Sequence, residues 1–176
     1  IFGYDTKSDD QTTGIAFTYQ DGEITSDNNE GVSNYKLYAV SPYLHKSIDQ
    51  QESVTLEASL NIGDFDSKRY LKFGAINRTA TSSYDTYGFS IRGSYNFTPE
   101  SDLARGDLNN SFGIGYIYSH RDSFSESGAN SLNLSVGSSD AHALIADATS
   151  SISWDFKNNG DKYLPYSSVG IEIFSY

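Results

Sequence analysis

The feature of the sequence that most constrains its fold is a two-residue alternation of apolar and polar side chains. In the segment 54–63 every second residue is aliphatic, and the residues between are polar or glycine. Such a period places one kind of side chain on each face of a β-strand. The alternation recurs in the segments 15–20, 35–44, 87–92, 112–119, 144–156 and 169–173. It predicts an all-β fold.

The segments between these strands are polar and rich in glycine, asparagine and aspartate, as turns and loops are. Examples are "SDDQTTG", "TSDNNEGVSN", "ESDLARGDLNN" and "KNNGDK", and none has the character of a domain linker. A chain of 176 residues is one ordinary domain. We therefore expect a single domain, residues 1–176, built of consecutive antiparallel hairpins.

Composition excludes several classes of partner. The net charge of -11, without any run of lysine or arginine, repels phosphate backbones, so we expect no nucleic-acid partner. The absence of cysteine excludes disulfides and thiolate metal sites. His45, His120 and His142 lack metal-ligand spacing, and we expect neither a metal nor a cofactor. No apolar run reaches the roughly 20 residues of a membrane helix.

The polar face of the strands indicates which solvent the apolar face meets. A soluble β-sandwich and a transmembrane β-barrel both alternate in this way. Here the residues of the polar face have small side chains, with single charges spaced among them, as expected for the lumen of an outer-membrane barrel. We expect the lumen-lining residues to be Lys36, Glu57, Arg92, Asp147 and Glu172. Lys36 is the least regular of these, because it shares a face with Tyr38 and Val40.

Four segments, in order, resemble the autotransporter (type V secretion) β-domain. They are "IFGYDTKSDDQTTGIAFTYQDGEITSDNNEGVSNYKLYAVSPYL", "RYLKFGAINRTATSSYDTYGFSIRGSYNF", "YIYSHRDSFSESGANSLNLSV" and "WDFKNNGDKYLPYSSVGIEI". The resemblance implies an outer-membrane translocator barrel that carries its own passenger to the cell surface. It further implies contact with outer-membrane lipid, the barrel-assembly machinery and periplasmic chaperones. It also runs a strand through Asp21-Gly22, a dipeptide that otherwise favours a tight hairpin.

The length of the chain bears on how much of such a barrel is present. Family barrels have twelve strands, and 176 residues have room for about eight at roughly ten residues each. We expect a barrel lacking N-terminal and C-terminal strands, with a closed eight-stranded barrel as the alternative. Two other functions stay open: an outer-membrane porin or surface adhesin, and a soluble β-sandwich binding module.

The stretch "FSESGANSLNLSV" is interpreted as a surface turn followed by a strand. Phe124 would anchor the outer rim of the membrane, Glu126 would be solvated or stabilise the turn, and Gly128 would take a positive φ angle. The alternation of Leu132, Leu134 and Val136 would then continue along the wall.

Evidence for catalysis is thin, and we expect no enzyme. No G-x-S-x-G nucleophile motif is present. His120 and Asp122 could sit on the outer rim, where some barrel hydrolases place their catalytic groups. The resemblance also suggests Asp147 and Glu57 as weak candidates for the lumenal acid that some family members use to cleave themselves.

Overall fold

The structure is a computed structural model that describes residues 1–176 except 28–29, 100–105, 155, 159–160, 164–165 and 176. Eight strands form one antiparallel sheet in the order β1-β2-β3-β4-β5-β6-β9-β12. Their bounds are β1 Phe2–Lys7, β2 Gln11–Thr25, β3 Gly31–Ser47, β4 Glu52–Phe73, β5 Ile76–Phe97, β6 Gly106–Arg121, β9 Ser139–Trp154 and β12 Tyr166–Ser175. Two small hairpins, β7 Phe124–Ser125 with β8 Ser135–Val136 and β10 Phe156–Asn158 with β11 Asp161–Tyr163, and the 3-10 turn η2 Asn130–Leu132 complete the described elements.

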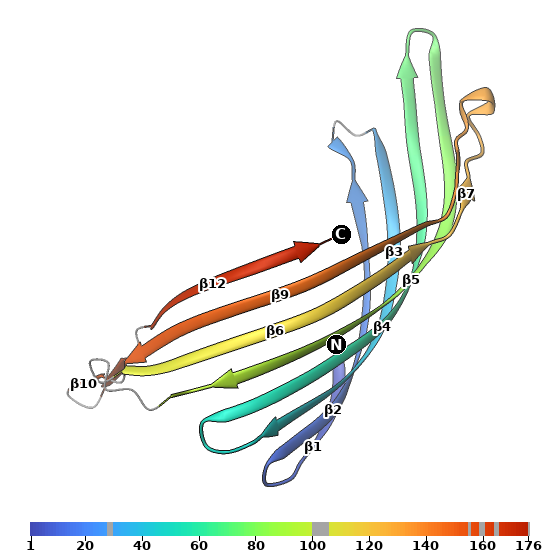
Figure 1. Ribbon diagram of the computed structural model, residues 1–176. Coiled ribbons are helices and arrows are strands. Elements are labelled where there is room, and N and C mark those ends of the chain that lie inside the picture. The colour runs from blue at the N-terminus through green and yellow to red at the C-terminus, as the bar shows by residue number, and fades with distance from the viewer. Residues whose placement is uncertain (28–29, 100–105, 155, 159–160, 164–165, 176) are drawn as a thin grey trace.

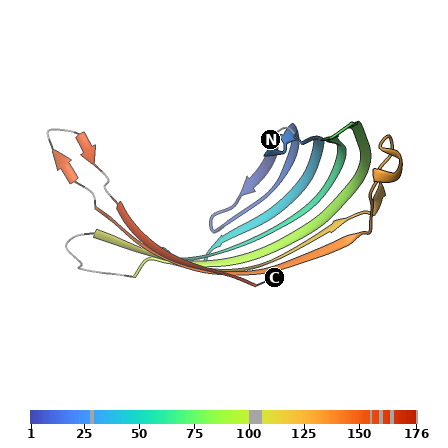
Figure 2. The same cartoon turned by 90° about the horizontal axis from the view of Figure 1, so that it is seen from above.

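The sheet is curved into an open trough (Figures 1 and 2). In the described part of the chain, β1 is hydrogen-bonded only to β2 and β12 only to β9. The segment 12–20 pairs with β1 and β3, not with the segment 169–174. The described sheet is therefore not the closed eight-stranded barrel that the sequence left as an alternative.

Apolar side chains cover the convex face of the trough and are exposed. Leu60 is 62% exposed, Ile114 60% and Ile171 68%, although each lies within a strand. Among the described residues, the only buried hydrophobic side chains are Ala80 and Ala129. A soluble β-sandwich needs a core between two sheets, and no second large sheet covers this face in the described residues. An apolar surface of this extent requires lipid or another apolar partner.

Two aromatic bands bound the apolar surface on the convex face. One contains Tyr19 and Tyr38, with ring centroids 5.1 Å apart, and Tyr87 with Tyr118. The other contains Phe97, whose ring centroid lies 5.9 Å from that of Tyr95 and 6.1 Å from that of Phe112. Aromatic girdles at both interfaces, separated by a strand length of roughly 9–11 residues, are typical of outer-membrane barrels.

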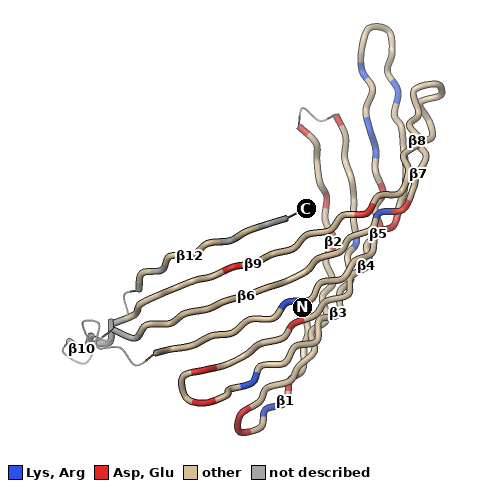
Figure 3. Tube along the Cα trace, viewed as in Figure 1, with Lys and Arg blue, Asp and Glu red and all other residues tan. Residues whose placement is uncertain are grey.

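Two strands extend far past the aromatic bands. β4 and β5 have 22 residues each and form a hairpin that projects beyond the rest of the sheet (Figure 1). We call this end of the sheet the hairpin end. β2 passes through Asp21-Gly22 without turning, as the family resemblance predicted. Charged residues gather at the ends of the strands (Figure 3). Within the described residues, no helix is long and apolar enough to cross a bilayer.

Candidate functional site

The concave face of the sheet carries a polar wall with an ion pair at its centre. Arg92 on β5 and Asp147 on β9 lie 2.7 Å apart, Nη2 to Oδ2. Glu57 on β4 lies opposite Arg92 in the strand register. A hollow of about 500 Å³ opens beside them, lined in part by Ser59 and Ser90. Three of the five residues predicted for the lumen thus share one hydrophilic face.

The Arg92–Asp147 pair skips a strand, because β6 lies between its two partners. The crossing needs a gap in the side chains of β6, and Gly113 provides it. A Cβ atom at Gly113 would lie 2.5 Å from Asp147 Oδ2 and 2.7 Å from Arg92 Nη2. The glycines of β6 therefore explain how charges on separate strands can meet.

A tyrosine crosses a strand in the same way near the start of the chain. The ring of Tyr43 on β3 covers Gly14 on β2, where a Cβ atom would lie 2.5 Å from the ring. The Tyr43 hydroxyl donates a hydrogen bond of 2.8 Å to Asp5 on β1. This contact ties the first strand to the third across the concave face.

The other two predicted lumen residues have different outcomes. Lys36 lies on the convex face with Tyr38, so its assignment to the polar wall was wrong. The register places it between Asp21 and Asp64, beyond the aromatic band, where β3 has left the apolar region and both faces can be polar. Glu172 lies opposite Asp147 in the register of β12, but its side chain is outside the described residues.

Aromatic rings form a row across the concave face toward the hairpin end. Phe65 lies 5.9 Å from Tyr35 and 5.1 Å from Tyr84, between ring centroids. Phe124 continues the row at 4.9 Å from Tyr84, with the Arg121 guanidinium 5.4 Å from its ring centroid. Phe124 therefore packs on the inner wall. The prediction that it anchors the membrane rim was wrong, because stacking on Tyr84 turns it away from the convex face.

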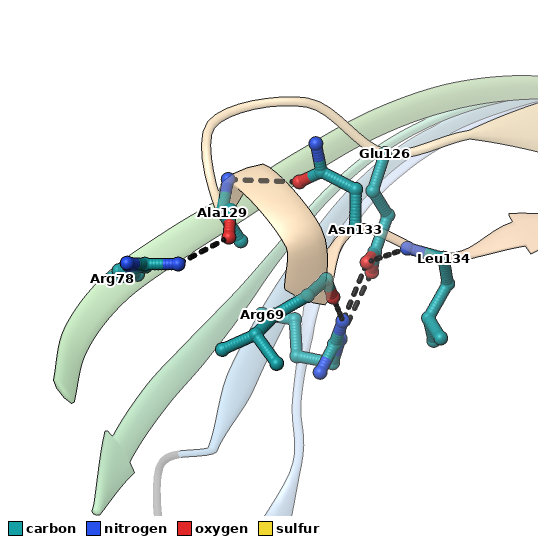
Figure 4. Close-up of polar contacts among 7 residues, drawn as sticks. Arg69, Arg78, Glu126, Ala129, Asn133 and Leu134 are labelled. Carbon is teal, nitrogen blue, oxygen red and sulfur yellow. Dashed lines mark hydrogen bonds and ion pairs between the residues drawn. The ribbon is translucent and has the colours of Figure 1, made fainter.

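Residues 122–138, here called the latch loop, fold against the β4–β5 hairpin (Figure 4). Arg69 on β4 donates hydrogen bonds to both Glu126 carboxylate oxygens, from Nε at 2.9 Å and from Nη2. Arg69 Nη2 also donates to the Leu132 carbonyl at 3.0 Å, and Arg78 Nη1 donates to the Ala129 carbonyl at 3.0 Å. Two arginines of the hairpin thus bind the loop by its carboxylate and its backbone.

The register explains how Arg69 reaches the loop. Ala80 on β5 lies opposite Arg69 and is 1% exposed, so the intervening strand again offers a small side chain where a long one crosses. β5 pairs with β6 from Thr86 to Phe97. The edge of β5 that precedes Thr86 is bridged at Thr81 by Ser127 of the loop. The latch loop therefore covers an edge of the sheet that would otherwise be unpaired.

Charge strengthens the contact between the loop and the hairpin. The Glu126 side chain is 7% exposed and also accepts the Leu134 N–H at 2.8 Å. The hydrogen bonds from Arg69 hold the pKa of Glu126 below its usual value, although burial acts in the opposite direction. The same pair raises the pKa of Arg69. Glu126 stabilises the turn, as one of the two sequence interpretations had it, and it is not a solvated carboxylate.

The conformation of the latch loop differs from the predicted turn and strand. Gly128 has a φ angle of 94°, the left-handed region expected of glycine in this turn. The expected strand at 132–136 is reduced to the two residues of β8. The reason is local: the Leu132 and Asn133 N–H groups donate to the Ala129 and Asn130 carbonyls in the turn η2, and the Glu126 side chain accepts the Leu134 N–H, so these groups cannot form a ladder.

His120 lies between two carboxylates at the convex side of the hairpin end. His120 Nδ1 is 2.8 Å from Asp140 Oδ1, and its Nε2 is 3.2 Å from Asp122 Oδ1. The sequence had nominated His120 and Asp122 as a rim pair, and the structure does bring them together. Because both ring nitrogens face carboxylates, neither is left to accept a proton from a serine nucleophile. Among the described residues, no group of three or more His, Asp or Glu side chains could hold a metal ion.

Comparison with known proteins agrees with the barrel wall described above. A family model described as the autotransporter β-domain matches residues 1–172. The chain belongs to the autotransporter β-domain family. The translocator domain of autotransporter NalP from Neisseria meningitidis has a similar structure, with a TM-score of 0.69 and 17% sequence identity. No curated protein is similar enough in sequence to count as a relative.

The match to the NalP translocator covers 97% of this chain and 57% of that one. The autotransporter β-domain described here thus spans little more than half the length of that translocator. At this identity the likeness shows the fold, an outer-membrane antiparallel β-barrel wall. The family match confirms the predicted membership in the autotransporter β-domain family and the outer-membrane location, and the structural match confirms the predicted antiparallel barrel fold.

Sequence reasoning did not identify the residues that bind the latch loop. Arg69 and Arg78 both lie in "RYLKFGAINRTATSS", the first part of a segment that resembles the family. Their partners lie 57 and 51 residues further along the chain. A contact between residues so far apart in the sequence produces no local periodicity from which it could be predicted. Within the loop itself, the signal was the single carboxylate Glu126, two residues before Gly128.

Proposed function

We propose that this autotransporter β-domain forms a large part of the wall of a pore through which its own passenger crosses the outer membrane. The observation that carries the proposal is the contrast between the two faces of one sheet. The convex face is apolar between two aromatic bands, and the concave face holds Arg92, Asp147 and Glu57. A wall with lipid on one side and water on the other satisfies both faces.

Closure of the pore would come from strands in the part of the translocator that this chain does not span. β1 and β12 leave backbone groups unpaired in the described sheet, and such edges are costly in lipid. The shares covered in the NalP comparison support further strands as the partners of these edges. The barrel-assembly machinery and periplasmic chaperones would protect the edges until they pair.

The hairpin end would face the cell exterior. The connections at the other end include the short turns 8–10 and 48–51, whereas the hairpin end carries the β4–β5 extension and the latch loop. Outer-membrane barrels have short periplasmic turns and longer extracellular loops. The charges of the concave wall would interact with water and with a passing polypeptide rather than with a substrate, so the function is transport without catalysis.

Photocrosslinking tests this function directly. A photoreactive amino acid at Ser59, on the concave face, should capture the passenger while the full-length protein is being secreted by Gram-negative cells. The same amino acid at the next residue, Leu60, on the convex face, should capture no passenger. Capture from both positions, or from neither while the passenger reaches the surface, would contradict the proposal. A barrel that passes small solutes but never contacts a passenger would be a porin.

A further inference from the structure

Arg69 is the point at which the attachments of the latch loop converge. Its guanidinium binds the Glu126 carboxylate and the Leu132 carbonyl, and Glu126 in turn binds the Leu134 N–H. One side chain of a neighbouring hairpin therefore holds residues 126 and 132 directly and residue 134 through Glu126. Arg78 adds a single bond to the Ala129 carbonyl, and Thr81 and Ser127 add a backbone bridge.

The attachment of the latch loop lies at the end of the concave wall along which a polypeptide would pass. Arg69, Tyr84 and Glu126 line a hollow of about 540 Å³ at the hairpin end. The strand alternation places Arg69 and Tyr84 on the same concave face as Arg92. This face therefore extends from the centre of the wall to the hairpin end. A loop that lost its attachments here would be free to move over the exit of the same wall.

We propose, resting on the translocation function above, that Arg69 is a positioning residue for export. Through Glu126 it holds the latch loop on the β4–β5 hairpin and keeps it out of the path by which the passenger leaves. Breaking this contact leaves the Glu126 carboxylate, which is 7% exposed, without its cation. The loop then exchanges its attachment for solvent and obstructs the exit.

The experiment compares Arg69→Ala with Lys68→Ala in the full-length protein with its passenger. Lys68 is the adjacent residue on β4, exposed on the convex face, so the control removes the same charge from the other side of the strand. The release of the loop is read from thiol labelling of Ala129→Cys, because Ala129 is 0% exposed and the chain has no native cysteine. Passenger display at the cell surface is normalised to the amount of barrel that resists unfolding on an unheated gel.

Arg69→Ala should label about tenfold faster than the wild type at Ala129→Cys and display several-fold less passenger per folded barrel. Lys68→Ala should match the wild type in both. If Arg69→Ala does not assemble, Glu126→Gln removes the charge with little change of shape and should give the same two effects. Rapid labelling with unchanged passenger display, or unchanged labelling, would overturn the proposal.

A disulfide distinguishes positioning from a general loss of structure. Thr81 Oγ1 and Ser127 Oγ lie 3.2 Å apart, so Thr81→Cys with Ser127→Cys can lock the loop to β5 without Arg69. Oxidation of this pair in the Arg69→Ala background should restore export, and reduction should abolish it again. Failure of the lock to restore export would count against the proposal. Absence of passenger contact at Ser59 in the wild type would instead refute the translocation function, whatever the loop does.

Discussion

Replacing Gly113 with alanine should break the Arg92–Asp147 ion pair without touching either charged residue. The added Cβ would lie 2.5 Å from Asp147 Oδ2 and 2.7 Å from Arg92 Nη2. Both obstructing atoms are ends of flexible side chains, so the backbone can stay in place while the pair separates. Gly115→Ala is the matched control, because it lies on the same face of β6 and the atoms nearest to its Cβ would be the Ile91 carbonyl oxygen at 3.3 Å and carbons of Arg92 at 3.5 Å.

The size of the effect follows from the exposure of the two partners. The Arg92 side chain is 39% exposed and that of Asp147 15%, so the pair is neither a solvated surface pair nor a fully buried one. Its loss should cost about 1–2 kcal/mol. Both alanine variants gain about 0.5–1 kcal/mol from replacing glycine within a strand. The difference between them therefore isolates the pair, and Gly113→Ala should unfold about 1–2 kcal/mol more easily than Gly115→Ala.

Urea unfolding of the complete translocator in detergent, followed by gel mobility and tryptophan fluorescence, measures this difference. In an Arg92→Leu background Gly113→Ala should cost no more than Gly115→Ala, because no guanidinium remains to displace. Equal stability of the two alanine variants in the wild-type background would refute the account of the strand-skipping pair. So would a penalty at Gly113 that persists without Arg92.

Three further outcomes are expected. Leu56→Arg places a charge in lipid and should cost about 2–4 kcal/mol in the same unfolding assay, whereas Ser59→Arg on the wet face should be tolerated. Gly14→Ala, whose Cβ would lie 2.5 Å from the Tyr43 ring, should free the first strand and speed its amide exchange, and Tyr43→Phe, which loses only a hydrogen bond, should have a smaller effect. Because Arg69 lowers the pKa of Glu126, the stability that this pair contributes is present above the ordinary glutamate pKa of about 4.3 and is lost as pH falls through the lower pKa of the folded state. Amide exchange of residues 126–134, corrected for its intrinsic pH dependence, should rise in that range and should not do so in Glu126→Gln.

The strands were predictable because the signal for each is local. Alternation within 54–63 fixes which side chains share a face, and β4 contains that segment with the expected sidedness. Alternation also places Lys36 on the face of Tyr38, and its assignment to the polar wall was wrong because β3 continues beyond the aromatic band, where a charge can face outward. The period of a strand does not reveal where the membrane ends.

The site was less predictable because its contacts join distant segments. Arg92 meets Asp147 only because Gly113 leaves a gap between them. Phe124 is an aromatic residue of the type that anchors a membrane rim, and its stacking on Tyr84 becomes evident only from the fold. The alternation of Leu132, Leu134 and Val136 predicted a strand, but the turn η2 and the Glu126 side chain bind the backbone N–H groups that a strand would need.

Single-cysteine scanning of β4 tests the central claim, that one sheet separates lipid from a water-filled pore. The chain has no native cysteine, so each residue from Val54 to Ile62 can be replaced in turn in the complete translocator in liposomes. A membrane-impermeant thiol reagent should label Glu57, Ser59 and their face with a period of two. A lipid-soluble quencher should reach only the alternate positions, including Leu56 and Leu60. Aqueous labelling of the Leu56 face, or labelling without a period, would contradict the account.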